Sequence, residues 1–190
     1  MVLLHLPRVC WSIARGMAQQ RGTVASANYG YSHDAPHVYR ARVNALLDAD
    51  QFLHMNNASY FVHAELARWE MGVAMGHAAH TARIGAAFIV ASTTMRFRRE
   101  LRPLQAFEVH SSMAAADDRS MWFLQTFHSR GGDKVAGGMC RAVLRKGRSV
   151  VEPPALLASL GVDAVVLESL RAAVPKAEHE ALSVLEKALA

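Results

Sequence analysis

Asp50-Gln-Phe-Leu-His54-Met-Asn-Asn-Ala-Ser-Tyr60 is a polar segment that leads into a long apolar one, and it predicts a loop followed by a helix over 58–75. Short polar residues before a helix satisfy its free N–H groups, and the start of a helix favours negative charge. A carboxylate shortly before such a start, here Asp50, can act on a bound and polarised carbonyl group. The segment therefore indicates hydrolysis of an ester or thioester.

Hydrophobic periodicity around this segment predicts one α+β domain at residues 36–150. A first strand is expected over 37–47, and the helix that follows is apolar on nearly every side, so protein must surround it. Four further strand-like segments are joined by short turns, which implies antiparallel neighbours. These segments are residues 85–98, 105–115, 119–129 and 134–146. The pattern predicts a sheet that curls around a buried helix.

The chain after residue 150 changes in character. Pro153 and Pro154 open a stretch in which periodicity predicts a helical extension over 151–190, with Asp163 as a helix cap. The expected helices are 155–160, 164–173 and 176–189. They are expected to pack on the domain or on a neighbouring subunit, and a separate partner-binding role is the alternative.

Residues 1–35 form a leader of different composition. It contains Arg8, Arg15 and Arg21 among apolar residues, and no acidic residue precedes Asp34. An amphipathic, arginine-bearing and acid-free N-terminus is typical of a mitochondrial transit peptide. The alternative is a disordered or surface-bound leader of no targeting value, which leaves a cytoplasmic location open.

Composition narrows the classes of function. The 190 residues are 52% hydrophobic and 19% charged with a net charge of +5, which indicates an ordered domain that favours anionic partners. No nucleic-acid partner is expected, because the aromatic residues that should accompany a basic stripe are missing. No apolar run is long enough to span a membrane. Cys10 and Cys140 lie far apart and His77 and His80 lack a third ligand, so neither a disulfide framework nor a metal site is expected.

The polar loop also carries a resemblance to a known family. Asp-x-Asp-x-x-x-His-Met-Asn-Asn-x-x-Tyr, beginning at Asp48, resembles the signature of the hotdog-fold acyl-CoA thioesterases, the 4-hydroxybenzoyl-CoA-thioesterase-like superfamily. Arg96-Phe-Arg-Arg-Glu-Leu-Arg-Pro-Leu104 is similar to a stretch in its "thioesterase superfamily member" branch. The resemblance covers roughly residues 37–147. It implies a hotdog fold, with a curled sheet of about five strands around a long central helix, and hydrolysis of acyl-CoA without a further cofactor.

The resemblance assigns roles to the loop and the helix start. Asp50 is the expected catalytic residue, either as the nucleophile or as the base that activates water. The backbone N–H of Asn57 is the expected oxyanion donor. His54 either orients Asp50 or the thioester, or only holds the loop; Asn56 is expected to fix the loop, although it remains a candidate for substrate contact. Tyr60 is expected to line the acyl pocket.

Charged residues further along are assigned with alternatives. Glu65 is a second candidate for the catalytic carboxylate, but an ion pair with Arg68, three residues on, is the favoured interpretation. The cations of the later stretch suit the phosphates of coenzyme A, since guanidinium groups bind phosphates well; the alternative is a solvated strand edge. These cations are Arg96, Arg98 and Arg99.

Two further expectations follow. Leu53 stands where the commonest family pattern has glycine, and this restricts approach of the backbone to a substrate, so a non-catalytic acyl-CoA-binding or lipid-binding protein is the alternative function.

One sheet covers the apolar helix on one side only, and a second subunit can cover the rest. A homodimer or homotetramer is therefore expected, with Asp50 near the subunit boundary.

Overall fold

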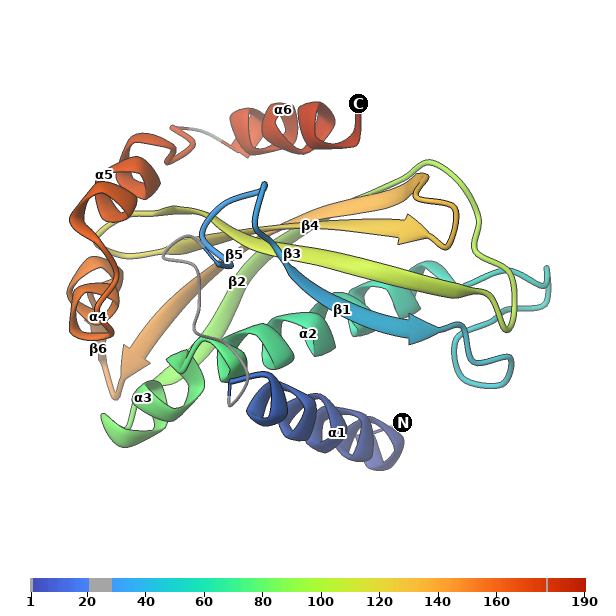
Figure 1. Ribbon diagram of the computed structural model, residues 1–190, viewed down its shortest axis with the longest axis horizontal. Coiled ribbons are helices and arrows are strands. Elements are labelled where there is room, and N and C mark those ends of the chain that lie inside the picture. Colours follow the sequence, from blue (N-terminus) through green and yellow to red (C-terminus); the bar gives the residue numbers. More distant parts are fainter. Residues whose placement is uncertain (1, 21–28, 177) are drawn as a thin grey trace.

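The fold is a curled antiparallel sheet with a long helix along one face, the hotdog fold that the sequence predicted. The computed structural model describes residues 2–20, 29–176 and 178–190. Helix α2 lies under the sheet in Figure 1. Five strands run in the order β1-β3-β4-β5-β2, and a short sixth strand pairs with β5. They are β1 His37–Arg42, β2 Ala87–Phe97, β3 Ala106–Ala116, β4 Met121–Ser129, β5 Lys134–Lys146 and β6 Ser149–Val151.

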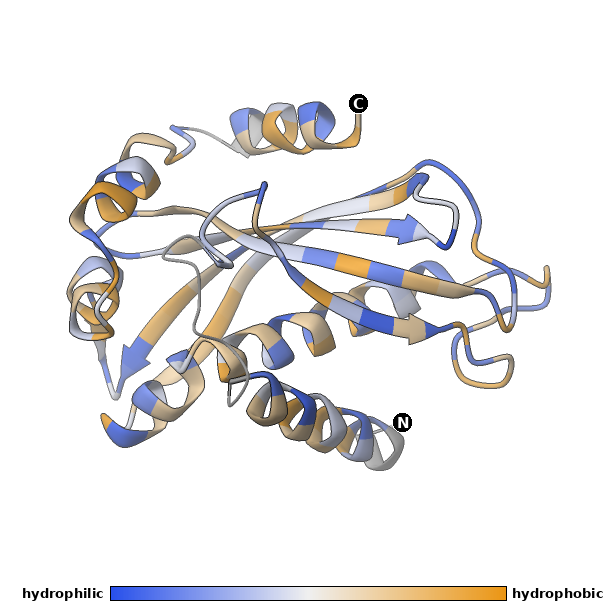
Figure 2. Cartoon of the chain, in the orientation of Figure 1, coloured by the Kyte–Doolittle hydropathy of each residue, from blue (hydrophilic) through white to orange (hydrophobic). Residues whose placement is uncertain are grey.

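Helix α2 (Asn57–Ala74) begins directly after its capping residue Asn56 and ends just before Gly76. Asn56 caps its start, since the side chain accepts a hydrogen bond from the Ala58 N–H. The chain leaves the helix at Gly76, whose φ of 78° is easy for glycine alone. Strands β2 to β5 also lie where periodicity predicts them, and Figure 2 shows the alternation of apolar and polar residues along β3.

Three local features differ from the sequence predictions. Strand β1 ends at Arg42 and does not continue to residue 47. The Asn44 side chain causes this, because it accepts hydrogen bonds from the N–H groups of Leu46 and Leu47 and so folds the backbone into a turn. Helix α3 (His77–Arg83) and the three-residue strand β6 were not expected, since both are too short to give a clear period.

The C-terminal helices are α4 Pro153–Ser159, α5 Ala164–Ala172, which Asp163 caps as expected, and α6 Glu178–Leu189. Among them, α6 covers the face of the sheet that α2 leaves open, whereas α4 and α5 pack at the end of the sheet in the core cluster that contains Met71 of α2. In Figure 1, α6 lies over β4 and β5. A Cβ atom on Gly137 of β5 would come within 2.9 Å of the side chains of Leu185 and Leu189, so glycine permits this close approach. With helices on both faces, strand β4 is buried at successive positions and not only at alternate ones.

The expected leader contains helix α1 (Val2–Gln20), which packs against the outer side of α2. Residues 1 and 21–28 of that leader lie outside the described residues. No helix in the described part of the chain is both long and apolar enough to cross a membrane.

Candidate active site

The loop before α2 is closed by a set of backbone hydrogen bonds. Asp50 N donates to His54 O (3.0 Å) and Leu53 N donates to Asp50 O (3.1 Å), which makes a tight turn. Leu53 at the tip has φ of 59°, a conformation that costs an L-residue roughly 1–2 kcal/mol. Its side chain is 72% exposed. Leu53 therefore has the left-handed backbone conformation that glycine adopts easily, and glycine is the residue that the family pattern usually has at this position.

Asp50 combines a structural bond with a partly free carboxylate. Its Oδ1 accepts a hydrogen bond from the Phe52 N–H (2.9 Å), which holds the turn. Its Oδ2 lies 3.3 Å from His54 Nδ1. The Asp50 side chain is 15% exposed, so solvent or a ligand can reach it. The carboxylate has lone pairs to spare for a proton or an attacking role.

The start of α2 is beside this turn. Asn56 fixes the loop, as the sequence suggested, because its side chain is used in capping. Asn57 is the first helical residue, and within the described chain its N–H has no hydrogen-bond acceptor. A free N–H at a helix start is suited to a developing oxyanion.

A pocket of about 260 Å³ brings several predicted residues together. Tyr60, at its base, is 2% exposed and packs edge-on against Phe97 and Phe127, each with ring centroids 5.1 Å apart. Burial raises the pKa of Tyr60 to about 12, so the phenol stays neutral. The pocket is lined by His54, Met55, Asn57, Tyr60, Phe97, Arg98, Arg99 and Glu100. Asp50 does not line it directly and stands behind His54.

The arginine cluster is only partly gathered at this pocket. Arg98 and Arg99 line it, but Arg96 does not. Arg98 donates to the carbonyl oxygen of Leu189, and Arg96 forms an ion pair with Glu186, so helix α6 engages both side chains. Arg96 therefore has a partner that the sequence did not predict, because α6 covers this strand end. Residues so distant in sequence give no local pattern from which such contacts can be predicted.

The predicted ion pair between Glu65 and Arg68 is not formed, and this corrects the sequence interpretation. Glu65 Oε2 lies 3.5 Å from His5 Nε2, on helix α1. Arg68 donates instead to the Oε1 of Gln125, a fully buried residue of β4. The amide of Gln125 presents its oxygen to Arg68 because its Nε2 donates to Ala64 O and to Ser111 Oγ, each at 2.9 Å. A neutral acceptor in the sheet has replaced the expected carboxylate.

Sequence reasoning missed a buried polar cluster at the base of the loop. Arg8 of α1 donates to Asp48 Oδ1 (3.0 Å), and Asp48 Oδ2 lies 3.1 Å from His63 Nε2. Tyr39 OH is 3.2 Å from the other ring nitrogen of His63. Burial raises the pKa of Asp48, but hydrogen bonds from His63 and from the Asn44 N–H, together with the charge of Arg8, lower it to about 2. Asp48 is thus a fully paired anion.

This cluster also fixes the loop before α2. Asn56 N donates to the carbonyl oxygen of Asp48 (2.8 Å), and Ala49 and Met55 form an isolated β-bridge. Burial, opposed by Asp48, lowers the pKa of His63, so its imidazole is neutral near pH 7. Asp48, the first aspartate of the motif, thus has a structural role, which includes the contact between α1 and α2.

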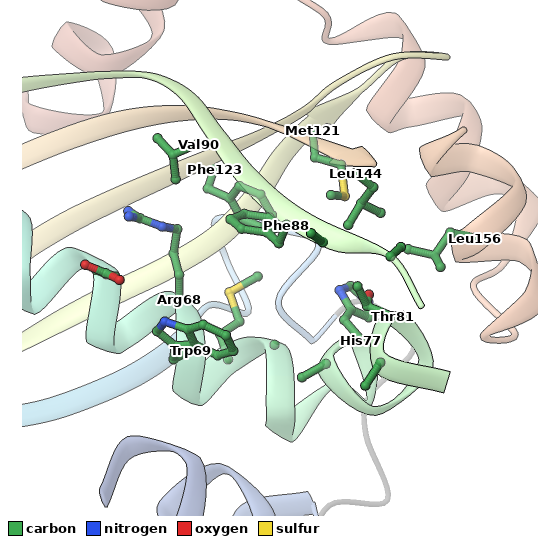
Figure 3. A pocket seen from close by; sticks show the side chains of 17 residues that line it. Arg68, Trp69, His77, Thr81, Phe88, Val90, Met121, Phe123, Leu144 and Leu156 are labelled. Atoms are coloured by element: carbon green, nitrogen blue, oxygen red, sulfur yellow. The ribbon is translucent and has the colours of Figure 1, made fainter. Parts of the chain in front are cut away.

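A larger and mostly apolar cavity of about 430 Å³ lies between α2, α3 and the sheet (Figure 3). Arg68 and Glu65 line it from α2, and His77 lines it from α3. His77 Nε2 is 2.6 Å from the Tyr31 hydroxyl, and burial lowers the pKa of His77 to about 4. The apolar lining includes Trp69, Phe88, Met121, Phe123, Leu144 and Leu156. A flexible apolar group has room here.

The chain is similar in sequence to curated proteins from other organisms. The chain is 32% identical over 114 residues to Protein THEM6 from Danio rerio, an alignment that covers 60% of this chain and 56% of that protein. The chain spans about half the length, or less, of the curated relatives it matches.

Solved structures share the fold at low identity. YbaW, a probable thioesterase from Escherichia coli, superposes with a TM-score of 0.61 at 17% identity, over 71% of this chain and 99% of that one. A hypothetical protein from Staphylococcus aureus in complex with CoA also has a TM-score of 0.61, at 12% identity, over 76% of this chain and 91% of that one. The sequence profile of the thioesterase-like superfamily matches residues 45–170, which is more than half of the chain. The chain belongs to the thioesterase-like superfamily.

Proposed function

We propose that the chain is an acyl-CoA thioesterase, which hydrolyses the thioester to the free acid and CoA. The observation that carries the proposal is the pocket at which the free N–H at the start of α2 lies beside His54 and Tyr60. Membership in the thioesterase-like superfamily supports this proposal, as does the CoA complex of a solved protein of the same fold.

The proposed reaction uses the loop and the helix start together. The thioester oxygen accepts a hydrogen bond from the Asn57 N–H, a type of contact worth about 2.7–4 kcal/mol in the transition state. Asp50 either attacks the carbonyl carbon or takes a proton from the water that attacks it. The C–S bond then breaks. Where Asp50 is the base, the proton that it took from water passes to the CoA sulfur and the free acid leaves. Where Asp50 is the nucleophile, the CoA thiolate takes a proton from solvent, and water then hydrolyses the acyl-Asp50 anhydride to release the free acid. His54, 3.3 Å from Asp50, orients the carboxylate.

The cations of the pocket are proposed to contact CoA. Arg99 pairs only with Asp133 (3.0 Å), and both side chains are more than half exposed, so a phosphate can displace this partner. Arg98 lies in the same pocket but is held by the end of α6. Arg99 is therefore the main phosphate contact in this proposal, and Arg98 shapes the pocket beside it.

A homodimer is the proposed active form, because strand β2 is an open edge of the sheet. Large apolar side chains on β2 and α2 are 40–44% exposed along this edge, namely Phe61, Trp69, Phe88, Ile89, Val90 and Phe97. Antiparallel pairing of β2 with its copy would set the Phe97 end of one strand beside the Phe88 end of the other. Each Asp50 loop would then face the partner's larger cavity, which can hold the acyl group.

This arrangement keeps Glu65 in consideration, and it accounts for a dimer. Glu65 lines the larger cavity, so it would lie across from the partner's loop as the second candidate carboxylate. Helix α1 covers the outer side of α2, and α6 covers the other face of the sheet. On the α6 side, the sheet therefore offers no bare face for a second pair of subunits, whereas the outer side of α1 stays exposed. Light scattering of wild type and of Ile89→Lys, which places a charge on the β2 edge, tests this assembly: the variant is expected to be monomeric.

The alternative function is a binding protein without turnover. Leu53 favours it, because a side chain now stands at the turn where glycine would leave the backbone open.

A mitochondrial location is proposed from the composition of the leader, with the cytoplasm as the alternative. A reporter fused to residues 1–35 distinguishes the two locations.

The deciding experiment measures CoA release from a panel of acyl-CoAs by the full chain. Wild type should release CoA, and Asp50→Asn should keep the fold and lose at least about 10²-fold in kcat. Asp163→Asn, at the cap of α5 far from the pocket, is the matched control and should retain activity. Tight binding of acyl-CoA without release would favour the binding protein, and undiminished activity of Asp50→Asn would move the assignment to Glu65.

A further inference from the structure

Helix α1 is held with its polar side toward the domain. Arg8 donates to Asp48 (3.0 Å), Arg15 Nε lies 3.4 Å from Glu70 Oε2, and Gln19 donates to Glu70 Oε1 (3.0 Å). Asp48 and Glu70 are fully buried, so these contacts satisfy charges that would otherwise be costly. The polar side chains of α1 are therefore engaged by the domain, and Arg8 and Arg15 keep only 24% and 26% of their side-chain surface exposed.

The approach between α1 and α2 is close enough to fix the orientation of the helix. A Cβ atom on Gly16 would come within 2.6 Å of the Glu70 carbonyl oxygen, so only glycine fits at this point. Ser12, one turn earlier on the same side, is 1% exposed. Rotation of α1 about its axis would break these contacts, and the opposite side must remain outward.

That opposite side is apolar, which reverses the usual arrangement of a helix on a protein surface. Leu6 is 64% exposed, Trp11 is 66% exposed and Met17 is 49% exposed. The exposed residues of the described helix carry no charge, and we call them the α1 outer face: Leu6, Pro7, Cys10, Trp11, Ala14, Met17 and Ala18. A rigid apolar surface of this kind marks a site of interaction.

Among the described residues, nothing else in the proposed assembly covers this face. Helix α1 lies against α2 and beside β1, since Arg15 Nη1 donates to the Arg40 carbonyl oxygen. Strand β1 is one edge of the sheet and β2 is the other, so a dimer formed through β2 leaves α1 uncovered. Helix α6 packs on the opposite face of the sheet, and α4 and α5 lie at the end of the sheet.

We infer that the α1 outer face is a docking surface for an anionic lipid membrane, on which the helix lies flat. Interfacial helices bury one apolar face at the level of the headgroups, where tryptophan is favoured. The arginines of α1 are paired with the domain, but the chain as a whole has a net charge of +5, which is complementary to anionic lipid. A protein partner would find few hydrogen-bonding groups on this face from which to gain specificity. The inference does not depend on the proposed hydrolysis.

Co-sedimentation of the full chain with vesicles tests the inference. A larger fraction of the protein should sediment with vesicles of phosphatidylcholine and phosphatidylglycerol than with vesicles of phosphatidylcholine alone. Added salt should reduce this difference. The double variant Leu6→Ser/Trp11→Ser should lower the partition coefficient by about tenfold or more. Val165→Ser removes a side chain that is 77% exposed on α5 and is the matched control with unchanged binding.

A second readout follows Trp11 itself. Anionic vesicles should shift the tryptophan emission of wild type to shorter wavelength, and Trp11→Phe should lose that shift, because Trp69 and Trp122 lie elsewhere. Absence of vesicle binding by folded wild type overturns the inference, as does full binding by the double variant. If the double variant instead reduces the size of the particle without vesicles, the face binds a second copy of the chain.

Discussion

Asp48 and Asp50 belong to one short segment, but the regions that hold them differ in every physical respect. Asp48 is 1% exposed, and both of its oxygens are engaged by Arg8, His63 and the Asn44 N–H. Asp50 is 15% exposed and accepts one backbone hydrogen bond. The difference teaches that a saturated carboxylate holds the fold, whereas one with free lone pairs can accept a proton.

The largest expected effect is the loss of the buried partner. Asp48→Ala should lower the free energy of unfolding by about 3–5 kcal/mol, because it leaves Arg8 and His63 without their anion. Asp50→Ala should cost about 1 kcal/mol, the value of one turn hydrogen bond. Urea unfolding of both variants measures the contrast, and equal losses would contradict it.

A fall in pH should also destabilise the protein, because it protonates Asp48 and His63 in the buried cluster. The pKa of Asp48 is lowered to about 2, so its contribution to stability is complete above about pH 4, the value in the unfolded chain, and is lost as the pH falls to about 2. This contribution is about 2 kcal/mol. The lowered pKa of His63 means that the unfolded chain takes up its proton first, so stability also starts to fall below about pH 6.5.

Urea unfolding across this range of pH checks both signs. Asp48→Asn should flatten the decline between about pH 4 and pH 2, and Asp163→Asn, an exposed helix cap, should leave it unchanged. A wild-type protein whose stability is constant from pH 7 to pH 3 would show that the buried region does not carry these charges.

The elements around Asp48 and Asp50 could be predicted from the sequence, but the long-range contacts of their side chains could not, because no local pattern indicates them. The loop, its capping asparagine and helix α2 follow from residues that are close in sequence, as do the strands with their period of two. The contacts of Asp48 with Arg8, of Arg96 with Glu186 and of Arg68 with Gln125 join distant segments. One signal did exist: His63 is a polar residue on a helix that is otherwise apolar on that side, and it needed a partner.

Replacing an arginine near the pocket should have a smaller effect, and it tests the exposed region to which Asp50 belongs. Arg99→Ala should raise the KM for acyl-CoA by about tenfold or less with little change in kcat, because an exposed cation contributes modestly. Arg96→Ala is the control, since Arg96 is paired with Glu186 and does not line the pocket. Steady-state kinetics at two salt concentrations separates them. If Arg96→Ala raises KM as much as Arg99→Ala, the pocket is not the phosphate site.

The smallest effect concerns the backbone of the loop. Leu53 (φ 59°) and Leu104 (φ 66°) both have the left-handed conformation, and their side chains are 72% and 62% exposed. Glycine at either position relieves roughly 1–2 kcal/mol of strain, and the greater freedom of the unfolded chain offsets about 0.5–1 kcal/mol of it. Each variant should therefore gain about 0.5–1 kcal/mol in free energy of unfolding, as measured in urea.

The two glycine variants should differ in catalysis. Leu53→Gly should also raise kcat/KM, since it removes a side chain from the turn that Asp50 closes. Leu104→Gly, outside that turn, should change stability alone. A gain in stability by both variants without any gain in activity for Leu53→Gly would mean that the missing glycine does not limit turnover. A loss of stability on Leu53→Gly, but not on Leu104→Gly, would mean that the Leu53 side chain packs against a second subunit, because its exposure in one chain leaves it nothing else to stabilise.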